Sequence, residues 1–111
     1  MKRQLFLSAA TGVLALACSV TGRASGSAVD DGKALFAQDC ARCHSATTTE
    51  SQEGPGLKDL FKRDTLPGSG RPTTEANVRS QILNGGGGMP PFKGTLSNSQ
   101  VSALIAYLRT L

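Results

Sequence analysis

Five consecutive residues constrain this chain more than any other feature: Cys40-Ala41-Arg42-Cys43-His44, a C-x-x-C-H pattern. At the end of a helix, residues i and i+3 lie on the same face, so both thiols can reach one group. Two thiols at this spacing can add across the two vinyl groups of one haem, and the adjacent histidine then reaches the iron. The pattern therefore predicts covalent attachment of one haem c, around which the rest of the domain folds.

A close cysteine pair has three other common uses. Cys40 and Cys43 could form a plain disulfide in an oxidising compartment. A thioredoxin-like redox pair requires a β-α-β context, and this sequence lacks an alternating strand pattern. A zinc site requires four ligands, and His44 is the only histidine in the sequence, so an acidic residue would have to complete it. Haem attachment is the interpretation that the pattern favours.

Residues 1–28 are expected to be a secretory signal peptide. A positive start, Met1-Lys2-Arg3, precedes an apolar run from Leu5 to Cys18 and a stretch of small residues, which is the order found in such signals. The run has about fourteen residues, fewer than the roughly 20 that span a bilayer. A retained anchor helix is the alternative. Cleavage is expected after Ala24 or Ala28, because each has a glycine two positions earlier, Gly22 or Gly26, at position −3 of the cleavage site.

A second route for the N-terminal segment ends before Cys18. The sequence Ala15-Leu16-Ala17-Cys18 loosely resembles a bacterial lipobox, in which the cysteine becomes a lipidated N-terminus. A single acyl chain anchors a protein only marginally. In either case residues 29–111, the folded part, are expected in the periplasm of a bacterium or otherwise outside the cytoplasm. Only lipidation of Cys18 would attach this part to a membrane.

Removal of residues 1–28 changes the charge of the chain. The full sequence has 12 basic and 8 acidic residues, a net charge of +4. Lys2, Arg3 and Arg23 leave with the signal, so 9 basic residues face 8 acidic ones. This near-neutral balance excludes the basic-patch argument for a nucleic-acid partner. Cys18 leaves as well, and only the haem-motif cysteines remain.

Residues 29–111 are patterned as helices separated by loops rich in Gly, Pro, Ser and Thr. Acidic residues at the start of the first helix suit the positive end of its dipole. The last helix follows a capping box, Ser97-Asn98-Ser99-Gln100. The expected segments are Asp30–Ala41, a short helix over Leu57–Arg63, a third from Thr73 or Thr74 as N-cap to Asn84–Gly85, and a fourth from Ser97 to Leu108. The fold class is therefore expected to be all-α.

Met89 is the candidate for the second axial ligand of the iron. With His44 as the only histidine and Met1 in the signal, Met89 is the one methionine of the mature chain. Four glycines precede it, which lets the backbone approach a flat macrocycle closely. Pro90 and Pro91 follow it and stiffen the loop. The alternative for a lone methionine is to fill the core.

The second ring nitrogen of His44 also requires a partner, which fixes the orientation of the ring. The segment Gly54-Pro55-Gly56 follows in the next loop, and the carbonyl of Pro55 is the candidate acceptor. The alternative for this segment is an ordinary turn.

The mature chain resembles the class I monohaem cytochromes c over its whole length, in particular the short bacterial members with Met/His ligation. The resembling segments occur in the order found in that family: Gly32–His44, Gly54–Arg63, Thr74–Asn77, Gly88–Phe92 and Leu104–Leu108. The resemblance implies the cytochrome c fold, with three main helices, a short helix and loops wrapped around one haem.

The resemblance also implies roles for site residues. Cys40 and Cys43 would form thioethers to the haem, His44 and Met89 would be the axial ligands, and the Pro55 carbonyl would accept a hydrogen bond from His44. These five residues form the core of the expected site.

Further roles that the resemblance implies concern the haem propionates and the helix packing. Arg63 matches an arginine that faces a propionate; the alternative is a solvated surface charge. Asn77 matches an asparagine near that propionate and the methionine side. Since this chain has no Trp, Arg71 or Thr73 would replace the tryptophan that many mitochondrial members use. Gly32 and Phe36 would cross the last helix near Tyr107.

With both axial positions filled by protein, the iron has no open site for a substrate, so one-electron transfer is expected and catalysis is not. The expected function is a soluble or lightly anchored carrier in a respiratory-type chain. It would dock transiently with a redox donor and acceptor (a dehydrogenase, a cytochrome complex or an oxidase) through a rim of Ala41, Gly86–Met89, Pro91 and Phe92. One alternative is a dedicated cytochrome c subunit of a dehydrogenase or oxidase complex. Another is a haem sensor or peroxidase in which Met89 dissociates.

Overall fold

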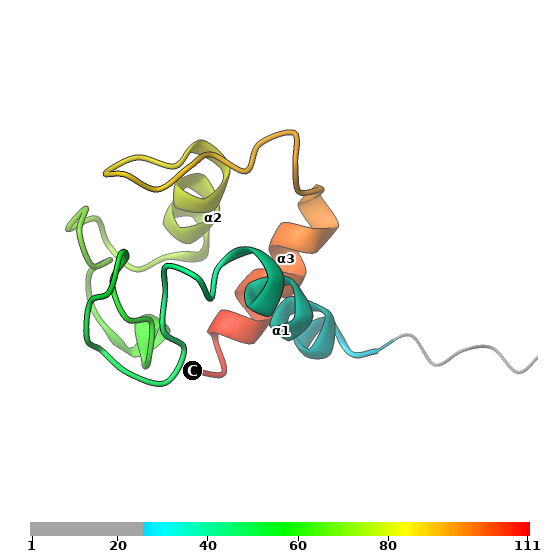
Figure 1. The fold of residues 1–111 in the computed structure, drawn as a ribbon, viewed down its shortest axis with the longest axis horizontal. Coiled ribbons are helices and arrows are strands. Elements are labelled where there is room, and N and C mark those ends of the chain that lie inside the picture. The colour runs from blue at the N-terminus through cyan, green and yellow to red at the C-terminus, as the bar shows by residue number, and fades with distance from the viewer. Residues whose placement is uncertain (1–25) are drawn as a thin grey trace, which may run out of the picture.

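The computed structural model describes residues 26–111. The expected signal peptide therefore lies almost wholly outside the described residues, as do Cys18 and the cleavage position after Ala24. The elements are α1 (Ala28–Asp39), a 3-10 turn (Leu60–Lys62), α2 (Glu75–Asn84) and α3 (Asn98–Leu108). Figure 1 shows α1 crossing α3, with α2 set apart from that pair and long loops joining the three helices. The predicted all-α class is confirmed.

Gly32 allows α1 and α3 to approach closely. A Cβ atom at this position would overlap the carbonyl oxygen of Ala103 and would lie 2.8 Å from Cβ of Tyr107. One turn further along α1, the ring of Phe36 packs against that of Tyr107, with a centroid separation of 5.4 Å and an interplanar angle of 59°. Tilted aromatic pairs of this kind are favourable beyond the area that they bury. The predicted contact between the two helices is confirmed.

The apolar core is built around α3. Val101 and Leu104 are the most completely buried large side chains, at 0% and 1% exposure. They follow the i, i+3, i+4 spacing that places apolar residues on one helix face. The residues that share this core are Phe36, Leu60, Leu66, Val78, Ile82, Leu96, Ile105 and Leu108.

Each helix starts at a hydroxyl residue that caps it. Thr74 caps α2, and Ser97 caps α3 within the complete capping box that the sequence predicts. The first predicted helix was placed two residues late: α1 starts at Ala28, because Ser27 Oγ accepts a hydrogen bond from the backbone N–H of Asp30 at 3.2 Å. At the C-terminal end of α2, Gly85 has a φ of 64° and is the predicted glycine stop.

The predicted short helix over Leu57–Arg63 is wrong in extent. Only Leu60–Lys62 form a helical turn, and it is of the 3-10 type. The reason lies at Asp59, which has a φ of 58°. A residue in the left-handed region cannot belong to a right-handed helix, so helical geometry begins only after Asp59.

Arg109, directly after α3, joins three elements of the fold. Its Nη2 lies 3.1 Å from Oε2 of Glu75 at the start of α2. Its guanidinium carbon lies 4.3 Å from the ring centroid of Phe61 in the 3-10 turn, a cation–π contact. Arg79 adds a second bond between the helices, from its Nη2 to Ser102 Oγ at 2.9 Å. The end of α3 is thereby tied to α2 and to the 3-10 turn.

Among residues 26–111, none of the helices has the length and apolar character that crossing a membrane requires.

Candidate haem-binding site

The C-x-x-C-H motif folds as a tight turn at the end of α1. Cys40 is the C-cap of the helix, and its carbonyl oxygen accepts hydrogen bonds from the backbone N–H groups of Cys43 at 3.1 Å and His44 at 2.9 Å. Both cysteines are half-buried free thiols. Because one carbonyl holds both ends of the motif, the two thiols and the imidazole have fixed positions relative to α1.

The Cys40 thiol is held in its protonated form. Burial raises its pKa to about 11, and the negative charges of Asp39 and Cys43 act in the same direction. A neutral thiol is a poor ligand for a metal ion and attacks a disulfide slowly. Within the described part of the chain, no three His, Cys, Asp or Glu side chains gather where they could hold a metal ion.

His44 is oriented by the loop that follows it. Its Nδ1 lies 2.8 Å from the carbonyl oxygen of Pro55. A carbonyl can only accept, so Nδ1 carries the proton and Nε2 keeps its lone pair. Gly54 packs against the same ring: a Cβ there would lie 2.5 Å from Cε1 and 2.8 Å from Nδ1. The sequence analysis assigned no role to Gly54, although its place directly before Pro55 was a signal.

Met89 ends a short hairpin that continues from α2. The backbone N–H of Gly86 donates to the carbonyl of Met89 at 2.9 Å, and the N–H of Met89 donates back at 3.1 Å. The two residues between them, Gly87 and Gly88, have φ values of 62° and 92°. This is the geometry of a two-residue turn that glycine adopts without strain. The glycine run therefore forms a closed turn that fixes the position of Met89.

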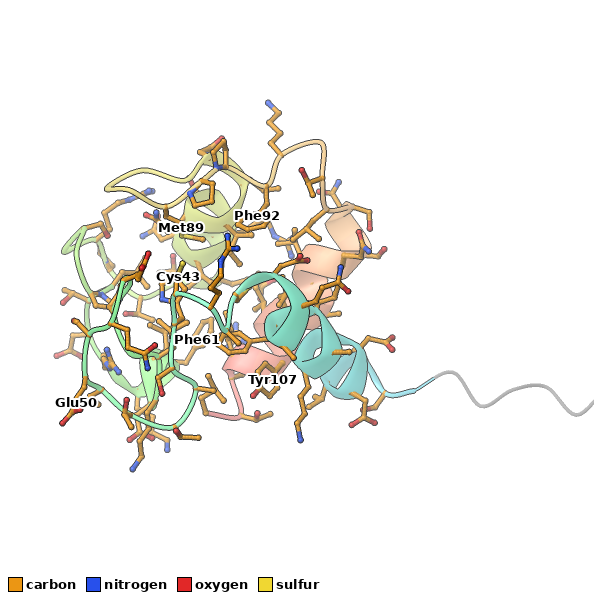
Figure 2. The ribbon with its side chains drawn as sticks, viewed as in Figure 1. Cys43, Glu50, Phe61, Met89, Phe92 and Tyr107 are labelled. Atoms are coloured by element: carbon orange, nitrogen blue, oxygen red, sulfur yellow. The ribbon has the colours of Figure 1, made fainter. Side chains whose placement is uncertain are left out.

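Gln81 contacts the sulfur of Met89, with Nε2 3.7 Å from Sδ. The sequence analysis missed this residue, because nothing in the spacing of α2 distinguishes it from a solvated glutamine. Figure 2 shows Met89 and Phe92 on the loop after α2 and Cys43 on the turn after α1; in this view Met89 lies between α2 and Cys43.

Three residues expected near the propionates gather where the chain enters α2. Arg71 Nη2 donates to Asn77 Oδ1 at 2.5 Å, and Asn77 Nδ2 donates to the carbonyl of Pro72 at 2.8 Å. Thr73 lies between them in the sequence, and its Oγ1 is buried without a hydrogen-bond partner. Buried hydroxyls normally have a partner, so the chain carries an unused polar group two residues after Arg71.

Arg63, which was also expected near a propionate, bonds the backbone of the loop that follows Pro55. Its Nη2 donates to the carbonyl of Gly56 at 3.0 Å and also to the carbonyl of Lys58. The guanidinium thus fixes the loop directly after Pro55. In this arrangement Arg63 holds the segment that orients His44.

The donor set as a whole fits a haem c. A free imidazole nitrogen and a thioether sulfur suit the two axial positions of the iron. Two thiols at i and i+3 suit the vinyl groups. The unpartnered hydroxyl of Thr73 suits a propionate, because a carboxylate can accept its hydrogen bond.

Comparisons with known proteins show the family of the chain. The model of the family described as cytochrome C oxidase, cbb3-type, subunit III matches residues 27–108. Cytochrome c6 of Leptolyngbya boryana is 38% identical over 77 residues, which cover 69% of this chain and 85% of that protein. Cytochrome c6 of Synechocystis sp. is also 38% identical over 77 residues, covering 69% of this chain and 60% of that protein.

A solved structure is also similar to this chain. The crystal structure of cytochrome c6 from the diatom Phaeodactylum tricornutum superposes with a TM-score of 0.58 at 28% identity, covering 74% of this chain and 91% of that one. The chain therefore belongs to the class I monohaem cytochromes c, where it is similar to cytochrome c6, and it is an electron-transfer protein that binds one covalent haem c.

Proposed function

We propose that this protein is an exported one-electron carrier of a respiratory-type chain. Cys40 and Cys43 form the thioether links, and His44 and Met89 are the axial ligands. The observation that carries the proposal is the hydrogen bond from His44 Nδ1 to Pro55, because it leaves Nε2 free to bind a metal in a fixed orientation. When bound, the haem supplies a reversible Fe(III)/Fe(II) couple.

The two axial residues determine what kind of chemistry the site performs. With His44 and Met89 both bound to the iron, the haem would have no position left for a substrate. A thioether sulfur in place of a second imidazole raises the reduction potential. The closed hairpin of Gly86–Met89 fixes the backbone of Met89, which favours an electron carrier over a sensor or peroxidase that must release Met89.

Pro55, Arg63 and Asn77 have supporting roles in the proposed site. Pro55 fixes the tautomer of His44, and Arg63 holds the loop that carries Pro55 through the carbonyl of Gly56. Asn77, with Arg71, presents donors at the start of α2 for a propionate.

The proposed docking surface is the rim of residues around the Met89 hairpin. Ala41, Gly86, Gly87, Gly88 and Pro91 are exposed, and Met89 and Phe92 are half-buried. This surface is small and carries few charged groups, as suits a brief encounter between redox proteins. The partners would be an electron donor and an electron acceptor, such as a dehydrogenase, a cytochrome complex or an oxidase.

Export is proposed from the character of residues 1–28. The two cleavage positions differ in their effect on α1: cleavage after Ala24 keeps Ser27, which caps the helix, and cleavage after Ala28 removes it. An N-cap contributes about 1 kcal/mol, so the cap favours cleavage after Ala24. Lipidation of Cys18 is the alternative.

A second candidate function is that of a permanent subunit in an oxidase or dehydrogenase complex. The description of the matching family, a subunit of a cytochrome c oxidase, favours it. The electron-transfer chemistry would be the same, but the partner would stay bound.

The two candidates differ in how the native protein purifies. A tagged full-length chain, expressed in its own host and extracted with mild detergent, should elute as a monomer with one haem and titrate as a single one-electron couple. Elution with a larger redox protein at constant stoichiometry through two columns would identify a subunit instead. Absence of a one-electron couple would contradict both candidates.

A further inference from the structure

The last residue of α2 is an asparagine followed by a glycine, Asn84-Gly85. An asparagine loses its side-chain amide when the backbone nitrogen of the next residue attacks the amide carbon and closes a succinimide ring. A glycine in the next position permits this attack best, because it has no side chain to obstruct the approach. The other two asparagines of the sequence, Asn77 and Asn98, are followed by valine and serine. The sequence therefore makes Asn84 the asparagine most exposed to this reaction.

The end of α2 slows the attack but does not block it. The backbone N–H of Gly85 donates to the carbonyl oxygen of Gln81 at 2.9 Å, which engages the attacking nitrogen. Nδ2 of Asn84 donates to Ser80 Oγ at 3.2 Å. Both bonds belong to the last turn of the helix, and the Asn84 side chain is exposed. Because the last turn of a helix opens at low cost in free energy, the reaction does not require global unfolding.

The fold requires the glycine that makes Asn84 reactive. Gly85 has a φ of 64°, in the left-handed region that favours glycine. A Cβ atom at Gly85 would overlap the carbonyl oxygen of Met89, and it would lie 2.8 Å from the carbonyl carbon of Pro90 and from the nitrogen of Pro91. The backbone at Gly85 is thus packed directly against the segment that carries Met89. Any change in the length of the chain at this point must move that segment.

We propose that Asn84 is a site of spontaneous deamidation whose products loosen the Met89 loop. The nitrogen of Gly85 forms a bond to Cγ of Asn84 and gives up its proton, while the Cγ–Nδ2 bond breaks and the amide leaves as ammonia. Water then opens the ring at one of its two carbonyls, which gives aspartate or isoaspartate. Neither product reverts to the amide, so the fraction converted increases with the age of the molecule.

The two products act on the loop in different ways. Both place a carboxylate at the C-terminal end of α2, where the helix dipole disfavours negative charge. Isoaspartate also routes the backbone through the side-chain carbon, so that the chain before Gly85 becomes longer by one carbon. Since Gly85 is in close contact with Met89 and Pro90, we expect isoaspartate to disturb the hairpin more than aspartate does.

The first experiment compares the haem-loaded wild-type protein with Asn84→Gln during prolonged incubation at neutral pH. Peptide mass mapping should find Asn84 converted to aspartate and isoaspartate several-fold faster than Asn77 and Asn98 in the same molecules. Asn84→Gln keeps an amide but would have to close a larger ring, so it should stay intact. Conversion of Asn84 that is no faster than that of Asn98 would overturn the proposed site.

The second experiment measures the effect on the loop without reference to the iron. The N–H groups of Gly86 and Met89, which bond each other's carbonyls across the hairpin, should exchange with solvent several-fold faster in the isoaspartate fraction. The N–H of Val101, bonded to the carbonyl of Ser97 in α3, is the control and should keep its rate. Unchanged exchange at both hairpin positions would overturn the proposed effect. The outcome does not depend on whether Met89 binds the haem iron.

Discussion

His44 Nδ1 and the carbonyl oxygen of Pro55 lie 2.8 Å apart. This hydrogen bond joins two residues eleven positions apart in the sequence and selects the tautomer of the neutral imidazole, because the carbonyl can only accept. Gly54 makes the contact sterically feasible, since any side chain at this position would collide with the ring. The loop after the haem motif thus determines which nitrogen of His44 is free to bind iron.

Gly54→Ala should damage the site through His44. The new Cβ would lie 2.5 Å from Cε1 of the ring, so either the ring or the loop must move. We expect a loss of about 1–3 kcal/mol in the free energy of unfolding, as overpacking typically causes, together with a reduced fraction of low-spin haem in the absorption spectrum. Ser51→Ala, exposed in the same loop, is the control. An unchanged spectrum and stability would show that the ring is not confined by Gly54.

Substitution of both motif cysteines should abolish covalent haem. Cys40→Ala combined with Cys43→Ala removes both thiols that can add to the vinyl groups. The measurement is haem staining of the protein after denaturing electrophoresis, which retains only covalent haem. Cys18→Ala changes a cysteine outside the motif and should keep the stain. Covalent haem in the double variant would contradict the attachment site.

Met89→Ala should remove the sulfur ligand while the covalent haem stays. The far-red absorption band of ferric haem with a sulfur ligand should disappear, and the reduction potential should fall, since the thioether raises it. Potentiometric titration and the ferric spectrum are the measurements. An unchanged band would mean that a different group occupies the axial position.

The Glu75 carboxylate should make stability depend on pH. Hydrogen bonds from Arg109 and then from Arg79, together with their positive charges, lower the pKa of Glu75 below its usual 4.5. The contribution of these contacts is therefore complete above pH 4.5 and is lost as the pH falls through the lower pKa of the folded state. Glu75→Gln should lower the urea midpoint at pH 7, and the two proteins should converge in acid. Glu50→Gln is the control; a constant difference at all pH values would refute the mechanism.

The N-terminus of the exported protein should retain the cap of α1. Cleavage after Ala24 gives a chain that begins at Ser25 and includes Ser27, whose Oγ accepts from Asp30. Ser27→Ala should cost about 1 kcal/mol in the free energy of unfolding. Intact mass spectrometry of the exported protein determines the first residue. A mass that begins at Val29 would rule out cleavage after Ala24, and a lipid adduct on Cys18 would indicate anchoring.

The features that the sequence predicted correctly depend on local chemistry. The capping box at Ser97 and the glycine stop at Gly85 are formed by neighbouring residues, so their structure follows from short-range hydrogen bonds. The contact of Gly32 and Phe36 with α3 could be predicted only from the family resemblance, and the fold confirms it. The assignment of ligands to the haem remains a prediction that the variants above test.

The features that the sequence did not predict depend on contacts between distant segments. The left-handed conformation of Asp59 shortens the predicted helix over Leu57–Arg63, and no residue type in that segment signals it. The contact between Gln81 and Met89 requires the hairpin to fold back onto α2. The hydrogen bonds from Arg63 to the carbonyls of Gly56 and Lys58 depend on where the loop lies, and the role of Arg63 toward a propionate stays a prediction.

The hairpin of Gly86–Met89 has a consequence for how a partner recognises this protein. Three exposed glycines without side chains form this loop, Gly86, Gly87 and Gly88. A docking partner would therefore contact the peptide backbone there. A partner can be complementary to this backbone in shape, but the backbone carries no charged group that would favour one partner over another. Discrimination between partners would then depend on charges outside the hairpin, such as those of the exposed Arg42 and Lys93.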